Sequence, residues 1–146
     1  MRILVTGSSG HLGEALMRTL ADSAHEAVGI DLLPSPWTHH VGSIADPAFV
    51  AQAMQGVNAV LHTATLHKPH VATHSRQAFV DTNITGTLNL LEAAVRAEMR
   101  AFGYTSPTSA FGRALSPTPG EPAAWITEDV RPVPKNIYGV TKVAAE

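Results

Sequence analysis

Short runs of apolar residues alternate with amphipathic stretches along the chain. This alternation is typical of a parallel β-sheet whose strands are joined by covering helices. The predicted strands lie at Arg2–Val5, Ala27–Ile30, residues 39–44, Asn58–His62 and Arg100–Thr105. The predicted helices are a stripe through Leu12, Leu16 and Leu20, a helix opened by Asp46-Pro47, a long helix over Ala78–Ala97 and a last helix from about Asn136. The pattern therefore predicts an α/β fold.

Residues 106–134 show no hydrophobic periodicity and hold six of the ten prolines. A stretch of this length without a pattern is usually a functional loop or a disordered one. The remaining elements predict one domain over residues 1–146, which is long enough to bury a single core.

Composition narrows the class of protein. Apolar residues make up 45% of the chain, charged residues 15%, and the net charge is −2. This balance fits a globular protein and gives no electrostatic reason to expect nucleic acid or an anionic membrane surface as a partner. There is no cysteine, no apolar run of about 20 residues, and no separate signal segment before the first strand. A soluble, cytoplasmic protein is the expectation.

Three glycines fall between the first predicted strand and the first predicted helix, in the stretch TGSSGHLG from Thr6 to Gly13. Here Gly7 and Gly10 let the backbone turn tightly and approach a pyrophosphate, whose charge a helix N-terminus stabilises. Asp31 ends the second strand, where its carboxylate can accept hydrogen bonds from a ribose 2′-hydroxyl and repel a 2′-phosphate. The motif predicts a dinucleotide site that prefers NAD to NADP. The alternative is a glycine turn beside a solvated aspartate.

Three histidines in the middle of the chain have a spacing that could place metal ligands on one face of a helix, namely His67, His70 and His74. However, Pro69 interrupts the turn, and no carboxylate follows until Asp81. We therefore expect a loop over the cofactor at this place, and no metal site.

Tyr138 and Lys142 stand four residues apart in the last predicted helix, so their side chains share one face. This spacing is common by chance, and a solvated helix face is the alternative explanation. The position of the pair after the fifth strand and the long loop is what favours a chemical role.

Four stretches together resemble a known family: TGSSGHLG, HTAT after the fourth strand, NITGTLNLLEAA in the long helix, and Tyr138-x-x-x-Lys142. They are similar to the extended short-chain dehydrogenases/reductases, and most of all to the NAD-dependent epimerases and dehydratases that act on nucleotide sugars. The resemblance implies a doubly wound Rossmann-type sheet with strand order 3-2-1-4-5 and NAD as cofactor. It also implies that residues 1–146 are the NAD-binding half of a longer enzyme, because the C-terminal substrate lobe of the family is absent.

The resemblance further implies roles for particular residues. Tyr138 would act as general base on a substrate hydroxyl while hydride passes to the nicotinamide. The Lys142 ammonium would lower the pKa of the Tyr138 phenol and hold the nicotinamide ribose. His67 or Lys68 falls where some relatives place a lysine beside the nicotinamide. The implied cofactor-binding residues are Gly7, Ser9, Gly10, His11, Leu12, Gly13, Asp31, Ser43, Ile44, Ala64, Asn83, Tyr138 and Lys142.

Two positions depart from the pattern of the family. Relatives carry a serine or threonine where this chain has Pro107, which has no hydroxyl. Either Ser106 or Thr108 takes over that catalytic role, or the chain lacks part of the triad. Ser43 stands where an aspartate often contacts the adenine amino group, which we expect to weaken cofactor binding without abolishing it.

These observations predict an NAD-dependent, epimerase/dehydratase-like oxidoreductase acting on a small molecule, a nucleotide sugar in the first instance. The alternatives are a carbonyl or steroid-type reductase of the same superfamily and a non-catalytic NAD-binding module. Without the second half of the enzyme, Arg100–Thr105 would form an unpaired sheet edge and the final helix would be short. We therefore expect a homo-oligomer, or a mobile final helix.

Overall fold

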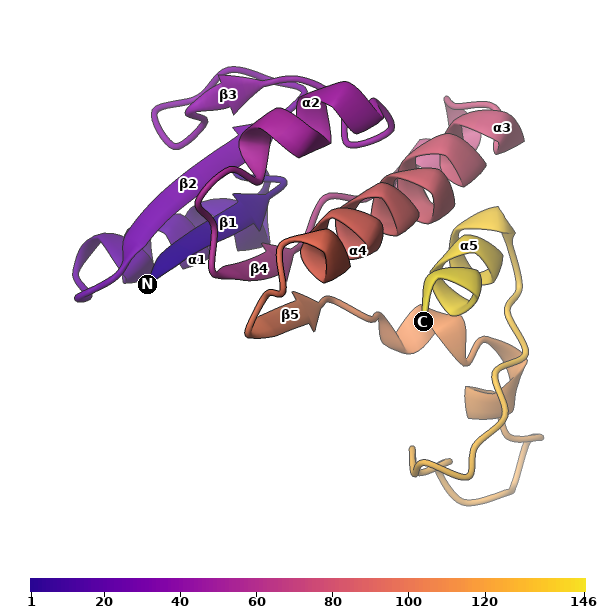
Figure 1. Cartoon of the computed structure of the whole chain (residues 1–146). Helices are drawn as coiled ribbons and strands as arrows, with labels where there is room; N and C mark the ends of the chain where they lie inside the picture. The colour runs from indigo at the N-terminus through magenta and orange to yellow at the C-terminus, as the bar shows by residue number, and fades with distance from the viewer.

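A five-stranded parallel sheet with helices on both faces forms the body of the molecule (Figure 1), and the computed structural model describes residues 1–146. The strands lie in the order β3-β2-β1-β4-β5, so the predicted order is confirmed. The strands are β1 (Arg2–Thr6), β2 (Glu26–Asp31), β3 (His40–Val41), β4 (Ala59–His62) and β5 (Ala101–Tyr104). The α-helices are α1 (His11–Ala21), α2 (Pro47–Ala53), α3 (Arg76–Phe79), α4 (Gly86–Arg96) and α5 (Ile137–Ala145). Shorter helical segments are η1 (Lys68–Ala72), η2 (Val80–Thr85), η3 (Thr108–Ala110) and η4 (Arg113–Leu115), of which η2 is a π-helix and the others are 3₁₀-helices.

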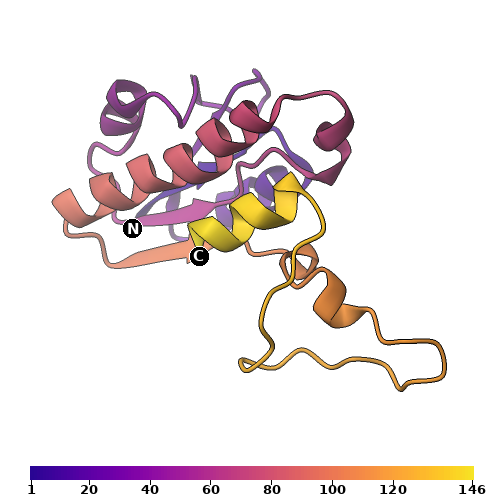
Figure 2. The ribbon, with the colours of Figure 1, turned by 90° about the vertical axis from the view of Figure 1, so that its right-hand side faces the viewer.

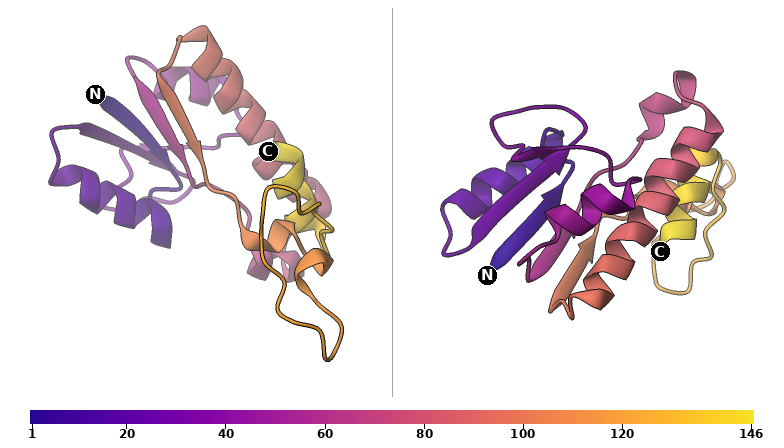
Figure 3. Two further views of the ribbon diagram at one scale, coloured as in Figure 1. Left: turned by 90° about the horizontal axis from the view of Figure 1, so that it is seen from below. Right: turned by 45° about the horizontal axis from the view of Figure 1, so that its top comes forward.

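The central strand β1 is covered on both faces, which explains its continuous apolar sequence. Helix α1 lies on one face, while α2 and α4 lie on the other (Figure 3). Leu4 and Val60 of the sheet, Val50 of α2 and Leu90 of α4 are all essentially inaccessible and belong to one core cluster. Burying side chains of this size contributes about 1.5–3 kcal/mol each, so this layer provides most of the driving force that holds α2 and α4 on the sheet.

The third strand is shorter than predicted. Only His40 and Val41 pair with β2, whereas the pattern predicted a strand over residues 39–44. The chain leaves the sheet at Gly42, where an added Cβ would lie 2.4 Å from the ring of Phe49 in α2. The Phe49 ring thus occupies the space that a side chain at residue 42 would need.

A single long helix was predicted over Ala78–Ala97, and the structure instead contains three consecutive segments, α3, η2 and α4. The run begins earlier than predicted, because the Ser75 hydroxyl caps it by accepting the backbone N–H of Ala78 at 3.1 Å. The π-helical turn in the middle is invisible to hydrophobic periodicity. Such turns often occur at functional sites, and this one carries the buried Asn83.

Strand β5 is an edge of the sheet, as predicted. Helix α5 lies beside the α3–η2–α4 run (Figure 2) and contacts η2 and η3. Asn136 caps α5 by accepting the backbone N–H of Gly139 at 3.0 Å, which agrees with the predicted start. Between η4 and α5 the chain extends away from the body of the molecule as an irregular loop, with residues 116–129 exposed. The expected self-association or mobility of this region stays a prediction.

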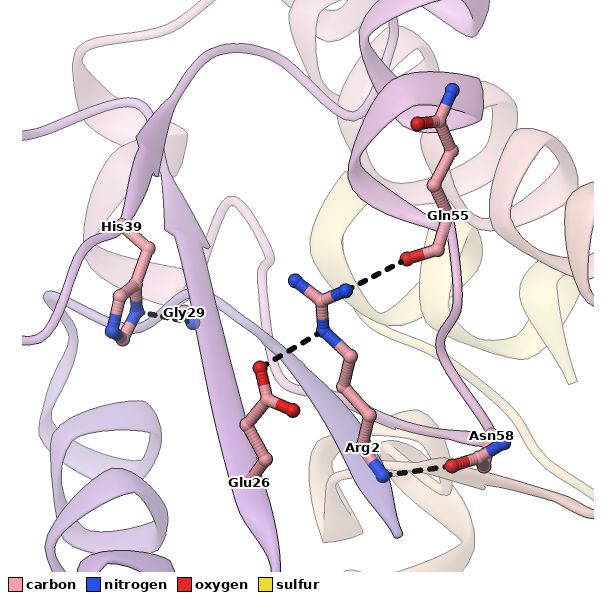
Figure 4. A network of polar contacts seen from close by, with 6 residues as sticks. All are labelled: Arg2, Glu26, Gly29, His39, Gln55 and Asn58. Atoms are coloured by element: carbon pink, nitrogen blue, oxygen red, sulfur yellow. Dashed lines mark hydrogen bonds and ion pairs between the residues drawn. The ribbon is translucent and has the colours of Figure 1, made fainter.

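Arg2 ties the beginning of the sheet together (Figure 4). Its Nε lies 3.2 Å from a carboxylate oxygen of Glu26 in β2, and its Nη1 donates to the carbonyl of Gln55 at 3.3 Å. The backbone N–H of Arg2 donates to Asn58 Oδ1 at 2.8 Å. The ion pair is exposed and contributes little to stability, so its main effect is to align the strand starts.

None of the helices is both long and apolar enough to cross a membrane.

Candidate functional site

A cavity of about 630 Å³ opens at the carboxyl ends of the strands. This is where ligands bind in open α/β sheets, and the volume is within the usual range for a small-molecule site. All of the predicted cofactor-binding residues except Asn83 and Lys142 line it. They are Gly7, Ser9, Gly10, His11, Leu12, Gly13, Asp31, Ser43, Ile44, Ala64 and Tyr138. Further lining residues that the sequence did not single out include Leu32, Thr63, Thr65, Leu66, Thr82 and Thr105.

The glycine loop is held by backbone contacts that exclude side chains. Gly7 adopts φ +74°, and a Cβ there would lie 2.8 Å from the backbone nitrogen of Ala64. A Cβ on Gly13 would lie only 1.9 Å from the carbonyl oxygen of Gly7. The first turn of α1 therefore packs directly on the loop, and its N-cap residue Gly10 provides no side-chain hydrogen bond to the first-turn amides. These amides remain available to an anion at the positive end of the helix.

Asp31 connects the glycine loop to the end of β2. Its Oδ2 accepts the backbone N–H of Ser9 at 3.0 Å, and its Oδ1 accepts that of Leu33 at 3.0 Å. Each carboxylate oxygen still has capacity to accept another hydrogen bond, and the side chain lines the cavity. A diol such as a ribose can use that capacity. The negative charge of the Asp31 carboxylate would repel a 2′-phosphate.

Behind the cavity, His62 of β4 sits at the centre of a buried hydrogen-bond network. Its Nδ1 lies 2.6 Å from the Thr6 hydroxyl, and its Nε2 lies 2.9 Å from the Thr87 hydroxyl. The Thr87 proton is already donated to the carbonyl of Asn83 at 2.7 Å, so Nε2 must carry the imidazole proton. The Thr6 hydroxyl accepts the backbone N–H groups of Thr63 and Ala64, and so it donates to Nδ1.

This network requires a neutral imidazole. Burial and, to a lesser extent, the charge of Lys142 lower the pKa of His62 to about 3. The sequence pattern offered HTAT only as a family feature and gave His62 no role. The structure shows that His62 orients the turn at residues 63–64, which forms part of the cavity wall.

Asn83 supports the site without lining it. Its Oδ1 accepts the backbone N–H of Leu66 at 2.8 Å, and its Nδ2 donates to the Thr141 hydroxyl at 3.0 Å. Thr141 in turn donates toward the backbone carbonyls of Ile137 and Tyr138. The π-helical turn therefore fastens α5 to the loop that follows β4. The predicted supporting role of Asn83 agrees with these contacts, while its predicted contact with the cofactor does not follow from them.

Tyr138 is 3% exposed, lines the cavity, and packs its ring against that of His67 with the centroids 5.0 Å apart. Burial raises the pKa of the Tyr138 phenol, and a contact with Ser109 lowers it in part. The prediction that Lys142 lowers this pKa is therefore wrong for the observed arrangement. The Lys142 ammonium instead lies 3.9 Å from the centre of the Tyr104 ring, and burial lowers the pKa of Lys142 to about 8. Desolvation thus outweighs the attraction expected from helical spacing alone.

The hydroxyls proposed to replace the one missing at Pro107 are not at the site. Pro107 itself lines the cavity, but Ser106 and Thr108 do not. The Ser106 hydroxyl bonds to the carboxylate of Glu146, and Thr108 is exposed. The hydroxyl beside Tyr138 belongs to Ser109, which the sequence pattern did not single out. Of the pair expected near the nicotinamide, His67 lines the cavity and Lys68 does not.

Comparison with known proteins agrees with this geometry. The model of the NAD dependent epimerase/dehydratase family matches residues 3–146, and the chain belongs to this family. A 3-beta-hydroxysteroid dehydrogenase of Mycolicibacterium neoaurum is 32% identical over 99% of this chain and 41% of its own length. The crystal structure of a short-chain dehydrogenase/reductase superfamily protein from Agrobacterium tumefaciens, with bound NAD, superposes with a TM-score of 0.86 at 32% identity, over 99% of this chain and 43% of that one. The crystal structure of a UDP-galactose 4-epimerase gives a TM-score of 0.84 at 27% identity, over 100% of this chain and 49% of that one.

The chain thus spans less than half the length of these relatives. Family membership identifies NAD as the cofactor of this domain. The residues present fit that cofactor, because the close packing of Gly7 and Gly13 leaves a cradle free of side chains, and Asp31 offers acceptors for a ribose.

Proposed function

We propose that the chain is the NAD-binding half of an oxidoreductase that transfers hydride at a hydroxyl-bearing carbon of a nucleotide sugar. One observation carries the proposal: a single cavity is lined both by the glycine loop with Asp31 and by the buried phenol of Tyr138. An anion-binding turn and a proton-transferring group on the same cavity are what such chemistry requires. The structural likeness to a UDP-galactose 4-epimerase supports the nucleotide-sugar class.

The chain's own residues would divide the work as follows. The first-turn amides of α1 hold the pyrophosphate, and Asp31 accepts hydrogen bonds from the adenosine ribose. When bound, NAD supplies the hydride acceptor. As hydride leaves the substrate C–H bond, the hydroxyl proton passes to Tyr138, which must be in its phenolate form to accept it, and the carbinol becomes a carbonyl. In the reverse direction Tyr138 returns that proton to the carbonyl oxygen.

A second candidate function is reduction of a carbonyl compound, of the steroid type. The raised pKa of Tyr138 favours it, because a protonated phenol at neutral pH is ready to donate to a carbonyl. The hydroxysteroid dehydrogenase among the relatives supports the same class. A non-catalytic NAD-binding module is the third possibility, and it predicts binding without turnover.

A substrate panel separates these functions. The full-length enzyme of which this chain is the proposed half is incubated with NAD and UDP-glucose or UDP-galactose, with NAD and a 3β-hydroxysteroid, and with NADH and the corresponding ketosteroid. Sugar products are followed by chromatography and nicotinamide reduction by absorbance. The proposal expects turnover of a nucleotide sugar that Tyr138→Phe abolishes. Turnover of the steroid alone would favour the second candidate, and NAD binding with no turnover on either panel would leave only the third.

A further inference from the structure

Four hydroxyl-bearing residues follow β5 around Pro107, namely Thr105, Ser106, Thr108 and Ser109, and Ser109 is the one that is not exposed. The hydroxyl of Ser106 is taken up by the Glu146 carboxylate, and Thr108 is exposed. The Oγ of Ser109 is buried and has no hydrogen-bond partner. Buried hydroxyls are nearly always paired, because leaving one unpaired costs the free energy of its lost hydration. Ser109 therefore calls for a functional explanation.

The backbone brings Ser109 to the first turn of α5. Ser109 is in η3, which contacts α5. At Gly139 an added Cβ would lie 3.1 Å from the Ser109 carbonyl oxygen and 2.9 Å from Cβ of Pro134. Because Gly139 directly follows Tyr138, the absence of a side chain at residue 139 lets η3 pack against the backbone of α5 next to the tyrosine.

We propose that Ser109 is a positioning residue for Tyr138, and that the Ser109 hydroxyl donates a hydrogen bond to the Tyr138 phenolic oxygen when that oxygen becomes charged. The inference rests on the proposed role of Tyr138 in proton transfer. A hydroxyl has a single proton to donate, and a hydrogen bond to an anionic oxygen is about twice as strong as one to a neutral oxygen. Ser109 would thus supply, from two residues further along the chain, the hydroxyl that Pro107 cannot.

The other ionisable groups around Tyr138 are few, which makes the effect of Ser109 measurable. His67 of η1 packs on the Tyr138 ring, and Tyr104 of β5 is the second phenol nearby. Lys142, on the same helix, lies over the Tyr104 ring. All variants described below keep His67 and Lys142, so differences between them report on the Ser109 hydroxyl.

The chain contains only two tyrosines, so Tyr104→Phe leaves Tyr138 as the single phenol. This background keeps the ring beneath Lys142. The protein is labelled with fluorotyrosine, whose phenol ionises at lower pH than that of tyrosine, and the fluorine NMR signal is followed through a pH titration. Circular dichroism at each pH verifies that the protein is folded. The experiment needs neither NAD nor substrate.

In this background we expect Ser109→Ala to raise the midpoint of the Tyr138 titration by about one pH unit, as loss of one charge-assisted hydrogen bond implies. Ser109→Thr keeps a hydroxyl and should restore the original midpoint, and Thr108→Ala is the matched control that should not shift it. An unchanged or lowered midpoint in Ser109→Ala, or an equal rise in Thr108→Ala, would overturn the inference. If Ser109→Ala shifts the Tyr138 midpoint but the substrate panel shows no turnover, the proposed function is rejected while the contact between Ser109 and Tyr138 is established.

Discussion

The glycine loop and the Tyr138 region line the same cavity but are held by different kinds of contact. Around the glycine loop the determining contacts are between backbone atoms, as at Gly13, where no side chain fits. Around Tyr138 they are hydrogen bonds made by polar side chains, which run from His62 to Thr87, from Thr87 to the backbone carbonyl of Asn83, and from the Asn83 amide to Thr141. The shape of the cavity at the glycine loop therefore depends on the absence of side chains, whereas at Tyr138 it depends on the polar groups of side chains.

The largest expected effect comes from placing the same substitution in each region. Gly13→Ala puts a Cβ 1.9 Å from the Gly7 carbonyl oxygen, whereas Gly103→Ala in β5 meets the Leu61 side chain at 3.2 Å and the Val60 carbonyl oxygen at 3.6 Å. We expect Gly13→Ala to lower the free energy of unfolding by about 4–5 kcal/mol and Gly103→Ala by no more than about 1 kcal/mol. Urea denaturation of both variants measures this. Equal losses would show that the loop is not restricted by its backbone.

The second prediction concerns acid stability. The unfolded chain binds a proton at His62 below about pH 6.5, whereas the folded chain binds it only near pH 3. The stability that a neutral His62 provides is therefore lost progressively as the pH falls through this window. Between pH 7 and pH 4 the loss should reach about 3 kcal/mol, at 1.36 kcal/mol for each pKa unit.

His62→Gln is the matched variant, because glutamine keeps one donor and one acceptor but cannot ionise. Its stability should depend less on pH over the same range, even if it is lower at neutral pH. Denaturation curves at a series of pH values compare the two proteins. Parallel pH profiles for the two would contradict the assignment of His62 as a buried neutral imidazole.

A smaller effect tests whether the two regions are energetically separable. Thr141→Val keeps the shape of the side chain but removes the acceptor for Asn83 Nδ2. We expect a loss of about 1–2 kcal/mol in the free energy of unfolding, with the affinity for NAD changed by no more than about twofold, because Thr141 does not line the cavity. Thr19→Val, at an exposed position of α1, is the control. A large loss of NAD affinity in Thr141→Val would mean that the regions are coupled.

The same contrast explains what the sequence could predict. The glycine loop and Asp31 were predictable because their residue types, spacing and order along the chain are distinctive, and the strand order followed from the resemblance to the family. The role of His62 was not, because an isolated histidine in an apolar strand does not show which hydroxyls will surround it. The π-helical turn at Asn83 was also missed, since hydrophobic periodicity does not show a single wider turn within a helix.

The prediction that the Lys142 charge lowers the pKa of Tyr138 was wrong for a related reason. Helical spacing places Lys142 on the same face as Tyr138 but does not show that the Tyr104 ring will hold the ammonium group. Likewise, the numbering around Pro107 favoured Ser106 or Thr108, whereas the 3₁₀ turn brings Ser109 to the tyrosine. Contacts between segments distant in the sequence decide both cases.

The central claim is that the cavity is an NAD site in which Asp31 binds the adenosine ribose. Calorimetric titration of the purified chain with NAD and with NADP, at equal ionic strength, tests it most directly. We predict that NAD binds at least about tenfold more tightly, a difference of about 1.4 kcal/mol, that Asp31→Ala narrows this gap, and that Asp22→Ala on the surface does not. Failure of NAD to bind, or equal or tighter binding of NADP to the unmutated chain, would contradict the account.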